Sequence, residues 1–308
     1  MLQQTRVETV VPYYDRFLRR FPTVHALAEA PIDDVLASWS GLGYYRRARL
    51  LHAGAMHVAE IGEVPSTRAT LRDVPGIGPY TAGAIASIAF GERVGLVDGN
   101  VARVLARLFV IDEDMRREGM RTATSLADAI VAEDDPGTWN QALMELGATI
   151  CTPKSPACEA CPVARSCRAR AEGRVASLPI LGAKTKPIEK RMQALVAVKK
   201  GLVLLARRKK DGLFGGLWEP PAIEGRKAAK DELVRRIPVR DVVRQGSVVH
   251  VLSHRRLTID VHVASLSDKL ERIDLPEPYE EARLVDPTAL KDLGIATLAR
   301  KVLAKARV

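Results

Sequence analysis

Residues 151–167 read CTPKSPACEACPVARSC and contain all four cysteines of the chain, Cys151, Cys158, Cys161 and Cys167. Six, two and five residues separate successive cysteines. Four clustered cysteines around a C-x2-C core, in a chain without a signal-peptide pattern, indicate a thiolate-ligated metal site rather than disulfides. Zinc and a [4Fe–4S] cluster both accept four thiolates, so ligand chemistry alone leaves the metal open, and buried unligated cysteines are the remaining alternative.

The bulk composition predicts a globular protein of two domains. The chain has 308 residues, more than one core usually holds, and no apolar stretch of membrane-spanning length. We therefore expect a soluble, cytoplasmic protein without a membrane partner. Its formal net charge of +10 favours a polyanionic partner. The basic residues are spread along the chain, and such runs are more often solvated surface than a binding stripe; they include Arg46, Arg47, Arg49, Arg103 and Arg107.

The pattern of the sequence changes once along the chain. From residue 1 to about 171 apolar residues recur at helical spacing, as in Val101, Val104 and Leu105, which predicts an all-α domain. Residues 172–191 lose this periodicity and are typical of a linker. Residues 192–308 contain short β-rich runs at 194–198, 202–206 and 257–266, and one predicted helix near 227–236. The predicted fold class is multidomain, all-α followed by a small α+β domain.

Two motifs upstream of the cysteines could meet a ligand. In VPGIGPYTAGA, residues 74–84, Gly76 and Gly78 predict a tight turn before a helix that begins near Tyr80. The free N–H groups of a helix N-terminus suit a phosphate oxygen, although a simple turn between helices is the alternative. Asp98 precedes an amphipathic helix and is as readily its N-cap as a catalytic carboxylate, with Asn100 as a candidate hydrogen-bond partner.

The cysteine spacing and the order of these motifs resemble the iron–sulfur members of the helix-hairpin-helix glycosylases, endonuclease III and the adenine DNA glycosylases. The resemblance implies a [4Fe–4S] cluster on the four cysteines, with a structural role beside DNA. It also implies that the hairpin holds DNA by its phosphates. Asp98 would face the sugar of the excised nucleotide and stabilise its oxocarbenium-like charge.

Tyr80 distinguishes two branches of this superfamily. Endonuclease III carries at this hairpin position a lysine that forms a Schiff base and leads to strand cleavage, whereas tyrosine has no amine. The resemblance therefore implies a monofunctional glycosylase with Tyr80 near the reacting nucleotide; a packing role is the alternative for this residue. A bifunctional lyase of endonuclease III type is a rival that Tyr80 and the C-terminal domain both oppose.

Three further stretches resemble the adenine DNA glycosylases: MLQQTRVETVVPYY at 1–14, GLGYYRRARL at 41–50 and WNQALMELGATIC at 139–151. By this resemblance Gln4 and Tyr44 enter the duplex at the mispair while the adenine is turned out of the stack. We call Gln4 and Tyr44 the wedge residues. The resemblance also assigns to DNA binding Gln3, Thr5 and Leu42, which lie beside the wedge residues in the sequence, and Gln141 and Met144, which would line the adenine pocket.

The C-terminal domain resembles the Nudix-like domain of adenine glycosylases from 194 to 220. The acidic helix that holds Mg²⁺ in Nudix hydrolases is replaced by KAAKDELVRRI at 227–237, so pyrophosphate hydrolysis is not expected. In the family this domain reads 8-oxoguanine through a Phe-Ser-His string, which corresponds here to Leu252, Ser253 and His254. Ser253 can still offer a hydroxyl, and a local hydrogen bond is the alternative role for His254.

The resemblance as a whole implies a monomeric, monofunctional enzyme that removes adenine opposite 8-oxoguanine or guanine in double-stranded DNA, at the nucleoid of a bacterial cytoplasm. Adenine departs readily only after its ring is protonated, and the family's general-acid glutamate would stand two places before Met1. Glu8 lies about two helical turns beyond that place and is not a convincing substitute. A catalytically silent mispair-binding protein is therefore the alternative function.

We expect a chain extended by its upstream codons to excise adenine faster than the 308-residue chain. The reason is that the extension would supply the missing proton donor. Single-turnover rates on a duplex with an 8-oxoguanine:adenine pair measure the difference, and equal rates for the two chains would contradict this expectation.

Overall fold

The computed structural model describes residues 1–2, 5–183, 187–252, 254–267 and 273–308. By its contacts the chain forms two compact units, Met1–Met56 with Thr185–Val308, and His57–Lys184. The first helices thus group with the C-terminal domain. The boundaries predicted near residues 171 and 192 stay predictions. Within the described residues, no helix is both long and apolar enough to span a membrane.

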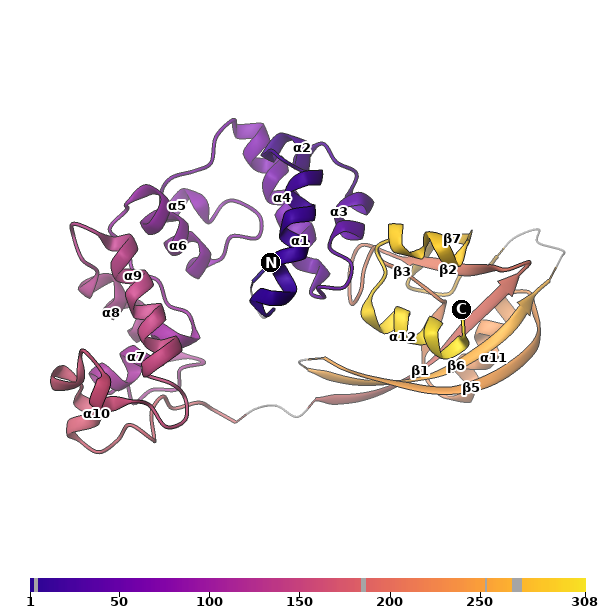
Figure 1. Ribbon diagram of the computed structural model, residues 1–308. Coiled ribbons are helices and arrows are strands. Elements are labelled where there is room, and N and C mark those ends of the chain that lie inside the picture. Colours follow the sequence, from indigo (N-terminus) through magenta and orange to yellow (C-terminus); the bar gives the residue numbers. More distant parts are fainter. Residues whose placement is uncertain (3–4, 184–186, 253, 268–272) are drawn as a thin grey trace. The chain divides into compact units, whose positions relative to one another are not determined.

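The unit of residues 57–184 is helical, as predicted. After α4 (Tyr45–Ile61), which it shares with the other unit, it contains α5 (Arg68–Leu71), α6 (Pro79–Phe90), α7 (Gly99–Phe109), α8 (Glu118–Ile130), α9 (Pro136–Glu145) and α10 (Arg168–Ala171), with short helical turns η1 (Leu146–Ile150), η2 (Cys158–Ala160) and η3 (Ala164–Ser166). Figure 1 shows α7 between α8, α9 and the loop that leads to α10. The α7 positions predicted to be apolar and inward, Val101, Val104 and Leu105, are all buried.

In the other unit, four helices surround a small aromatic core. They are α1 (Val7–Arg20), α2 (Val24–Ala28), α3 (Ile32–Ser38) and the first part of α4. The ring of Phe17 meets Trp39 edge to face with centroids 6.0 Å apart, and Trp39 is 2% exposed. Leu217 and Ala296 of the C-terminal domain belong to the same hydrophobic cluster, so these helices share a core with the sheet.

The C-terminal domain is a mixed sheet with a helix on each face (Figure 1). Its elements are β1 (Ile188–Lys199), β2 (Leu202–Arg208), β3 (Trp218–Glu219), β4 (Ala222–Glu224), α11 (Lys227–Arg236), β5 (Val239–Val251), β6 (Arg255–Leu266), β7 (Tyr279–Val285), η4 (Pro287–Asp292) and α12 (Thr297–Ala306). The strand order is β3-β2-β1-β6-β5, with β4 paired to β1 and β7 to β2. Only β1 and β6 pair in parallel among the described strands. The predicted strands and helix are confirmed, and β1 begins inside the predicted linker.

Alternation along β1 explains how one strand serves two cores. Ala194 and Val196 point to the cluster that contains α12, whereas Leu195 and Ala197 point to the cluster that contains Leu233 of α11. Successive side chains of a strand point to opposite faces, and both faces are covered here. Burial on both faces explains why every residue from 194 to 198 is apolar instead of every second one.

A buried carboxylate ties β1, β5 and β6 together. Asp260, whose side chain is 6% exposed, accepts from Arg191 Nε at 2.8 Å, Arg244 Nη2 at 2.7 Å and Ser247 Oγ at 2.7 Å. Burial alone would raise the pKa of Asp260, but these bonds outweigh it and hold that pKa well below its usual range. The ionised form is therefore the one that stabilises the fold.

Replacing this carboxylate should destabilise the C-terminal domain in a pH-dependent way. We expect Asp260→Asn to lower the free energy of unfolding by about 2 kcal/mol at pH 7, since bonds to a charged group are lost. The depressed pKa means that this contribution is complete above the unfolded pKa, about 4, and is lost as the pH falls further. The gap between parent and variant in urea denaturation should accordingly shrink from pH 4 toward pH 3.

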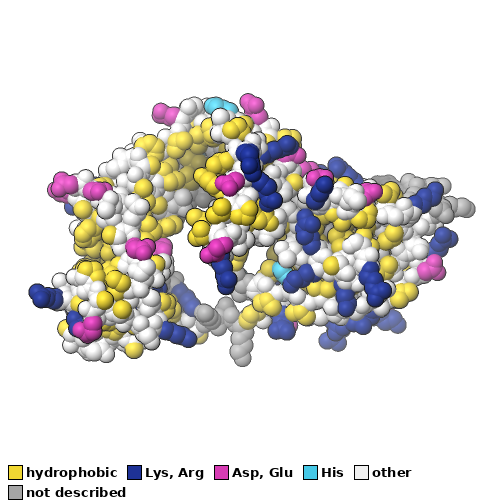
Figure 2. All heavy atoms as spheres, in the orientation of Figure 1, with side chains coloured by type: hydrophobic (Ala, Val, Ile, Leu, Met, Phe, Trp, Pro, Cys, Tyr) yellow, Lys and Arg dark blue, Asp and Glu magenta, His cyan; other side chains and the backbone are white. Residues whose placement is uncertain are grey.

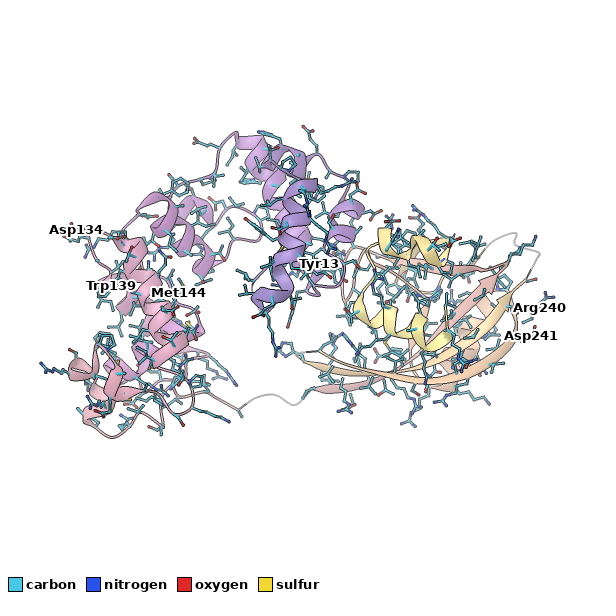
Figure 3. All side chains as sticks on the ribbon, viewed as in Figure 1. Tyr13, Asp134, Trp139, Met144, Arg240 and Asp241 are labelled. Carbon is cyan, nitrogen blue, oxygen red and sulfur yellow. The ribbon has the colours of Figure 1, made fainter. Side chains whose placement is uncertain are left out.

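Asp241→Asn is the matched control, because Asp241 is an exposed residue of β5 at the far end of the sheet (Figure 3). It should leave the unfolding free energy unchanged. A pH-independent effect of Asp260→Asn would contradict the role assigned to the ionised carboxylate.

Candidate functional site

Asp98 caps α7 and also presents a carboxylate oxygen beside Asn100. Its Oδ1 accepts from the backbone N–H of Asn100 at 2.8 Å and of Val101 at 2.7 Å. Its Oδ2 lies 3.3 Å from Asn100 Nδ2 and has no other hydrogen-bond donor among the described residues. The two readings of the sequence are therefore compatible, because one oxygen caps the helix while the other stays available to a substrate.

Tyr80 lies near enough to this carboxylate to be affected by its charge, and Met144 lies beside Tyr80. The Tyr80 hydroxyl is 3.4 Å from Sδ of Met144, a residue of α9 (Figure 3). Burial raises the pKa of the Tyr80 phenol, and the negative charge of Asp98 raises it further. Tyr80 therefore keeps its proton near neutral pH and acts as a hydrogen-bond donor rather than as a base.

Gln141 and Asn140 show that α9 has two distinct faces. Gln141, expected in the adenine pocket, is exposed, and its Nε2 lies 3.3 Å from the Gly137 carbonyl of the preceding turn. Asn140 was missed by the sequence reasoning: it is 1% exposed, and its Nδ2 donates to Ser87 Oγ and Val94 O, both at 2.9 Å. Asn140 thus fixes α9, and with it Met144, against α6.

The turn before α6 has the geometry expected of a hairpin that meets a ligand. Gly76 has a φ of +89°, a left-handed conformation that favours glycine. Gly78 is the N-cap of α6 and provides no side chain for the first N–H groups. A Cβ added at Gly78 would meet nothing within 4 Å among the described atoms, so internal packing does not require glycine there. The open space leaves these N–H groups accessible to an anion.

The four cysteines line one small cavity together with Arg107, Ile150 and Pro156. Among the described residues, no three Cys, His or acidic side chains converge as a single bound ion requires. Zinc would hold its thiolates about 2.3 Å from one centre. A [4Fe–4S] cluster also takes four thiolate ligands, and the donor set of this cavity suits a group of that kind.

Arg103 and Arg107 correct one expectation from the sequence. The sequence groups both with basic runs that are usually solvated, but they are only 9% and 2% exposed. Arg103 donates to Cys151 O at 2.7 Å and Gly147 O, and Arg107 to Thr152 O at 2.8 Å and Cys151 Sγ at 3.3 Å. No local pattern in the sequence signals this burial, because arginine counts as polar in helical periodicity. They hold the start of the cysteine loop on α7.

The residues expected to enter the duplex belong to the other unit. Tyr44 is half exposed, with a φ of +50°, and the Arg47 guanidinium lies 4.6 Å from its ring centroid. Thr5 is partly exposed just before α1. Leu42 is 6% exposed in the helical core and would have to leave it to touch DNA. Gln3 and Gln4 lie outside the described residues.

The string expected to read the opposite base lies on the hairpin loop between β5 and β6. Leu252 N–H donates to Arg255 O at 2.7 Å, which closes the loop, and His254 is exposed. His254 holds β1 through its carbonyl, which accepts from Ile188 N–H at 2.9 Å. Leu252 packs against the sheet core. Ser253 is outside the described residues.

Comparison with known families places the chain among repair proteins. Residues 1–128 match the HhH-GPD superfamily of base excision DNA repair proteins, 151–167 the iron–sulfur binding domain of endonuclease III, and 193–305 the NUDIX domain. The predicted fold class and [4Fe–4S] cofactor are thereby confirmed. A solved thermostable thymine-DNA glycosylase is 28% identical with a TM-score of 0.50, over 56% of this chain and 80% of that one.

Closer relatives identify the family. The adenine DNA glycosylase of Schizosaccharomyces pombe is 35% identical over 87% of this chain and 71% of its own length, and that of Homo sapiens 36% over 98% and 66%. The chain belongs to the adenine DNA glycosylase family. It spans slightly under two thirds of the length of the mammalian relatives that it matches, 63 to 66%.

Loss of the Arg107 charge should weaken iron retention. We expect Arg107→Met to lower the iron content per purified chain about tenfold, because partners of metal ligands influence affinity to that extent. Arg165→Met is the matched control, since Arg165 is exposed in the same loop. Iron analysis and the visible absorbance of the cluster measure the effect, and parental iron content in Arg107→Met would contradict the role of this contact.

Proposed function

We propose that the chain is a monofunctional adenine DNA glycosylase that removes adenine paired with 8-oxoguanine or guanine in double-stranded DNA, as a step of base excision repair. It would act as a monomer at the nucleoid of a bacterial cytoplasm. The observation that carries the proposal is the Asp98 carboxylate, held by Asn100 at the N-terminus of α7, with the Tyr80 phenol within reach of its charge. Membership of the adenine DNA glycosylase family supports the same activity.

Asp98 would act on the sugar. As the bond between C1′ and the adenine nitrogen breaks, positive charge develops on the sugar, and a carboxylate beside it lowers the barrier. Asn100 Nδ2 restrains Asp98 Oδ2 in place. Adenine takes up one proton from a general acid, which the family's glutamate would supply, and leaves as the neutral base. Water adds its oxygen to C1′ and releases one proton to solvent, which leaves an abasic sugar.

Tyr80 does not provide the amine through which a lysine at this position leads to strand cleavage. A phenol cannot form a Schiff base with the opened sugar. Because its pKa is raised, Tyr80 instead offers an O–H to the nucleotide while Met144 provides an adaptable apolar wall. We therefore propose base removal alone, and sodium borohydride should trap no covalent DNA adduct.

Other parts of the chain would hold the duplex. The amides around Gly78 and the basic side chains gathered over the C-terminal domain on the face in Figure 2 suit phosphates. Tyr44 and Gln4 would replace the displaced base in the stack, and Ser253 and His254 would meet the opposite base. Cys151, Cys158, Cys161 and Cys167 would hold the [4Fe–4S] cluster, which cross-links their loop when bound.

The test is single-turnover excision from a duplex with an 8-oxoguanine:adenine pair, with the 308-residue chain and its upstream-extended form. We expect Asp98→Asn to slow excision about a hundredfold in the active form, because the stabilising charge is removed. Asparagine also caps helices well, so the fold should persist.

Asp135→Asn is the matched control, because Asp135 caps α9 by accepting from Thr138 N–H at 3.0 Å. It should leave the rate unchanged. Binding to a duplex with 2′-fluoro-adenosine, whose glycosidic bond resists cleavage, separates recognition from chemistry. Absence of excision by both forms, or a parental rate for Asp98→Asn, would contradict the proposal.

A further inference from the structure

The loop that carries Tyr44 has a constrained backbone. Gly41 and Gly43 have φ values of +106° and +72°, and Tyr44, which is not a glycine, has +50°. A side chain in this left-handed region costs free energy and persists only where neighbouring contacts impose it. The contacts around residues 40–45 therefore decide where Tyr44 points.

Some of these contacts come from the helices beside the loop. Trp39 Nε1 donates to Gly43 O at 3.0 Å, and Gly41 N–H donates to the Tyr45 hydroxyl at 3.2 Å. On the α1 side a Cβ at Gly41 would overlap the Tyr13 hydroxyl (Figure 3), so Tyr13 would have to move to admit a larger residue there.

The remaining contacts come from the C-terminal domain, and they converge on one carbonyl. Tyr45, 7% exposed, donates its O–H to Ile295 O at 2.9 Å. Ser40 Oγ donates to the same oxygen at 3.2 Å and accepts from Arg300 Nη2 at 2.9 Å. Burial raises the pKa of the Tyr45 phenol, so it remains a donor. Residues on both sides of the loop are thus fixed to the segment that leads into α12.

Ile295 is in turn part of the sheet core. It is fully buried and forms a parallel bridge with Trp218. Its hydrophobic cluster includes Leu257 and Ile259 of β6, and Leu252 of the hairpin loop packs against it. A second contact ties α4 to the domain, because Arg49, one turn after Tyr45, donates to Lys210 O at 2.9 Å.

We propose that the C-terminal domain positions Tyr44 through the contact of Tyr45 and Ser40 with the Ile295 carbonyl. Tyr45 is a positioning residue, and the domain that meets the opposite base thereby also sets the angle of the wedge. This inference rests on the proposed function, because it assigns a role within mispair recognition. It goes beyond that function by making Tyr44 depend on a contact 250 residues away in sequence.

The test uses Tyr45→Phe, which keeps the buried ring and removes the hydroxyl. The measured quantity is the ratio of affinities for a duplex with 8-oxoguanine opposite 2′-fluoro-adenosine and for an undamaged duplex. We expect this ratio to fall about fivefold, as for one lost hydrogen bond. The fluorescence of 2-aminopurine placed beside 8-oxoguanine, which rises when the stack opens, should rise less. Ser40→Ala should act in the same direction.

Tyr14→Phe is the matched control, since Tyr14 is 51% exposed on α1. It should leave the ratio and the fluorescence unchanged. A double-mutant cycle separates positioning from general destabilisation. If Tyr45 acts through Tyr44, Tyr45→Phe should have no further effect in a Tyr44→Ala background, whereas additive effects would overturn the proposal.

Failure of this inference differs from failure of the proposed function. One outcome would overturn only the inference: the parent chain discriminates between the duplexes, Tyr44→Ala does not, and Tyr45→Phe discriminates as well as the parent. The coupling of Tyr45 to Tyr44 would then be wrong, while the proposed function would stand. If the parent chain does not discriminate at all, the function fails and the inference with it.

Discussion

The two buried guanidinium groups of α7 are the constraint on which the helical unit depends. Arg103 and Arg107 are surrounded by backbone carbonyls and by Cys151 Sγ, and no described carboxylate pairs with either of them. Uncompensated buried charge is costly, so these cations require the carbonyl oxygens and the Cys151 sulfur of the cysteine loop around them. The loop and the helix therefore specify each other, and the four cysteines, as thiolates of a bound cluster, would supply the negative charge that balances the two arginines.

The same helix connects this loop to the carboxylate of the site. Arg103 Nη2 donates to Asn100 Oδ1 at 3.0 Å, and Asn100 Nδ2 faces Asp98 Oδ2. A Cβ on Gly147 would overlap Asn100, so the turn before the first cysteine lies directly on this residue. The cysteine loop thus supports Asp98 through Asn100, as expected of a structural cluster.

The sequence predicts those parts of the site that have a local pattern. The spacing of the cysteines, Gly76 with Gly78, and Asp98 before an amphipathic helix each depend on a few neighbouring residues, and the structure places them in the expected elements. Burial of Arg103 and Arg107 has no such pattern, because helical periodicity counts arginine as polar. The buried amide of Asn140 and the core position of Leu42 likewise depend on which segment folds over them.

The adjacent residues Tyr44 and Tyr45 differ in a way that only tertiary contacts explain. Both are tyrosines in GLGYY, yet the first is half exposed and the second is buried. The left-handed φ of Tyr44 costs on the order of 1 to 3 kcal/mol, and each hydrogen bond around the loop contributes about 1 kcal/mol. The two quantities are similar, so the bonds to Ile295 are large enough to decide whether the exposed conformation persists. A residue distant in sequence can therefore determine the direction of the wedge.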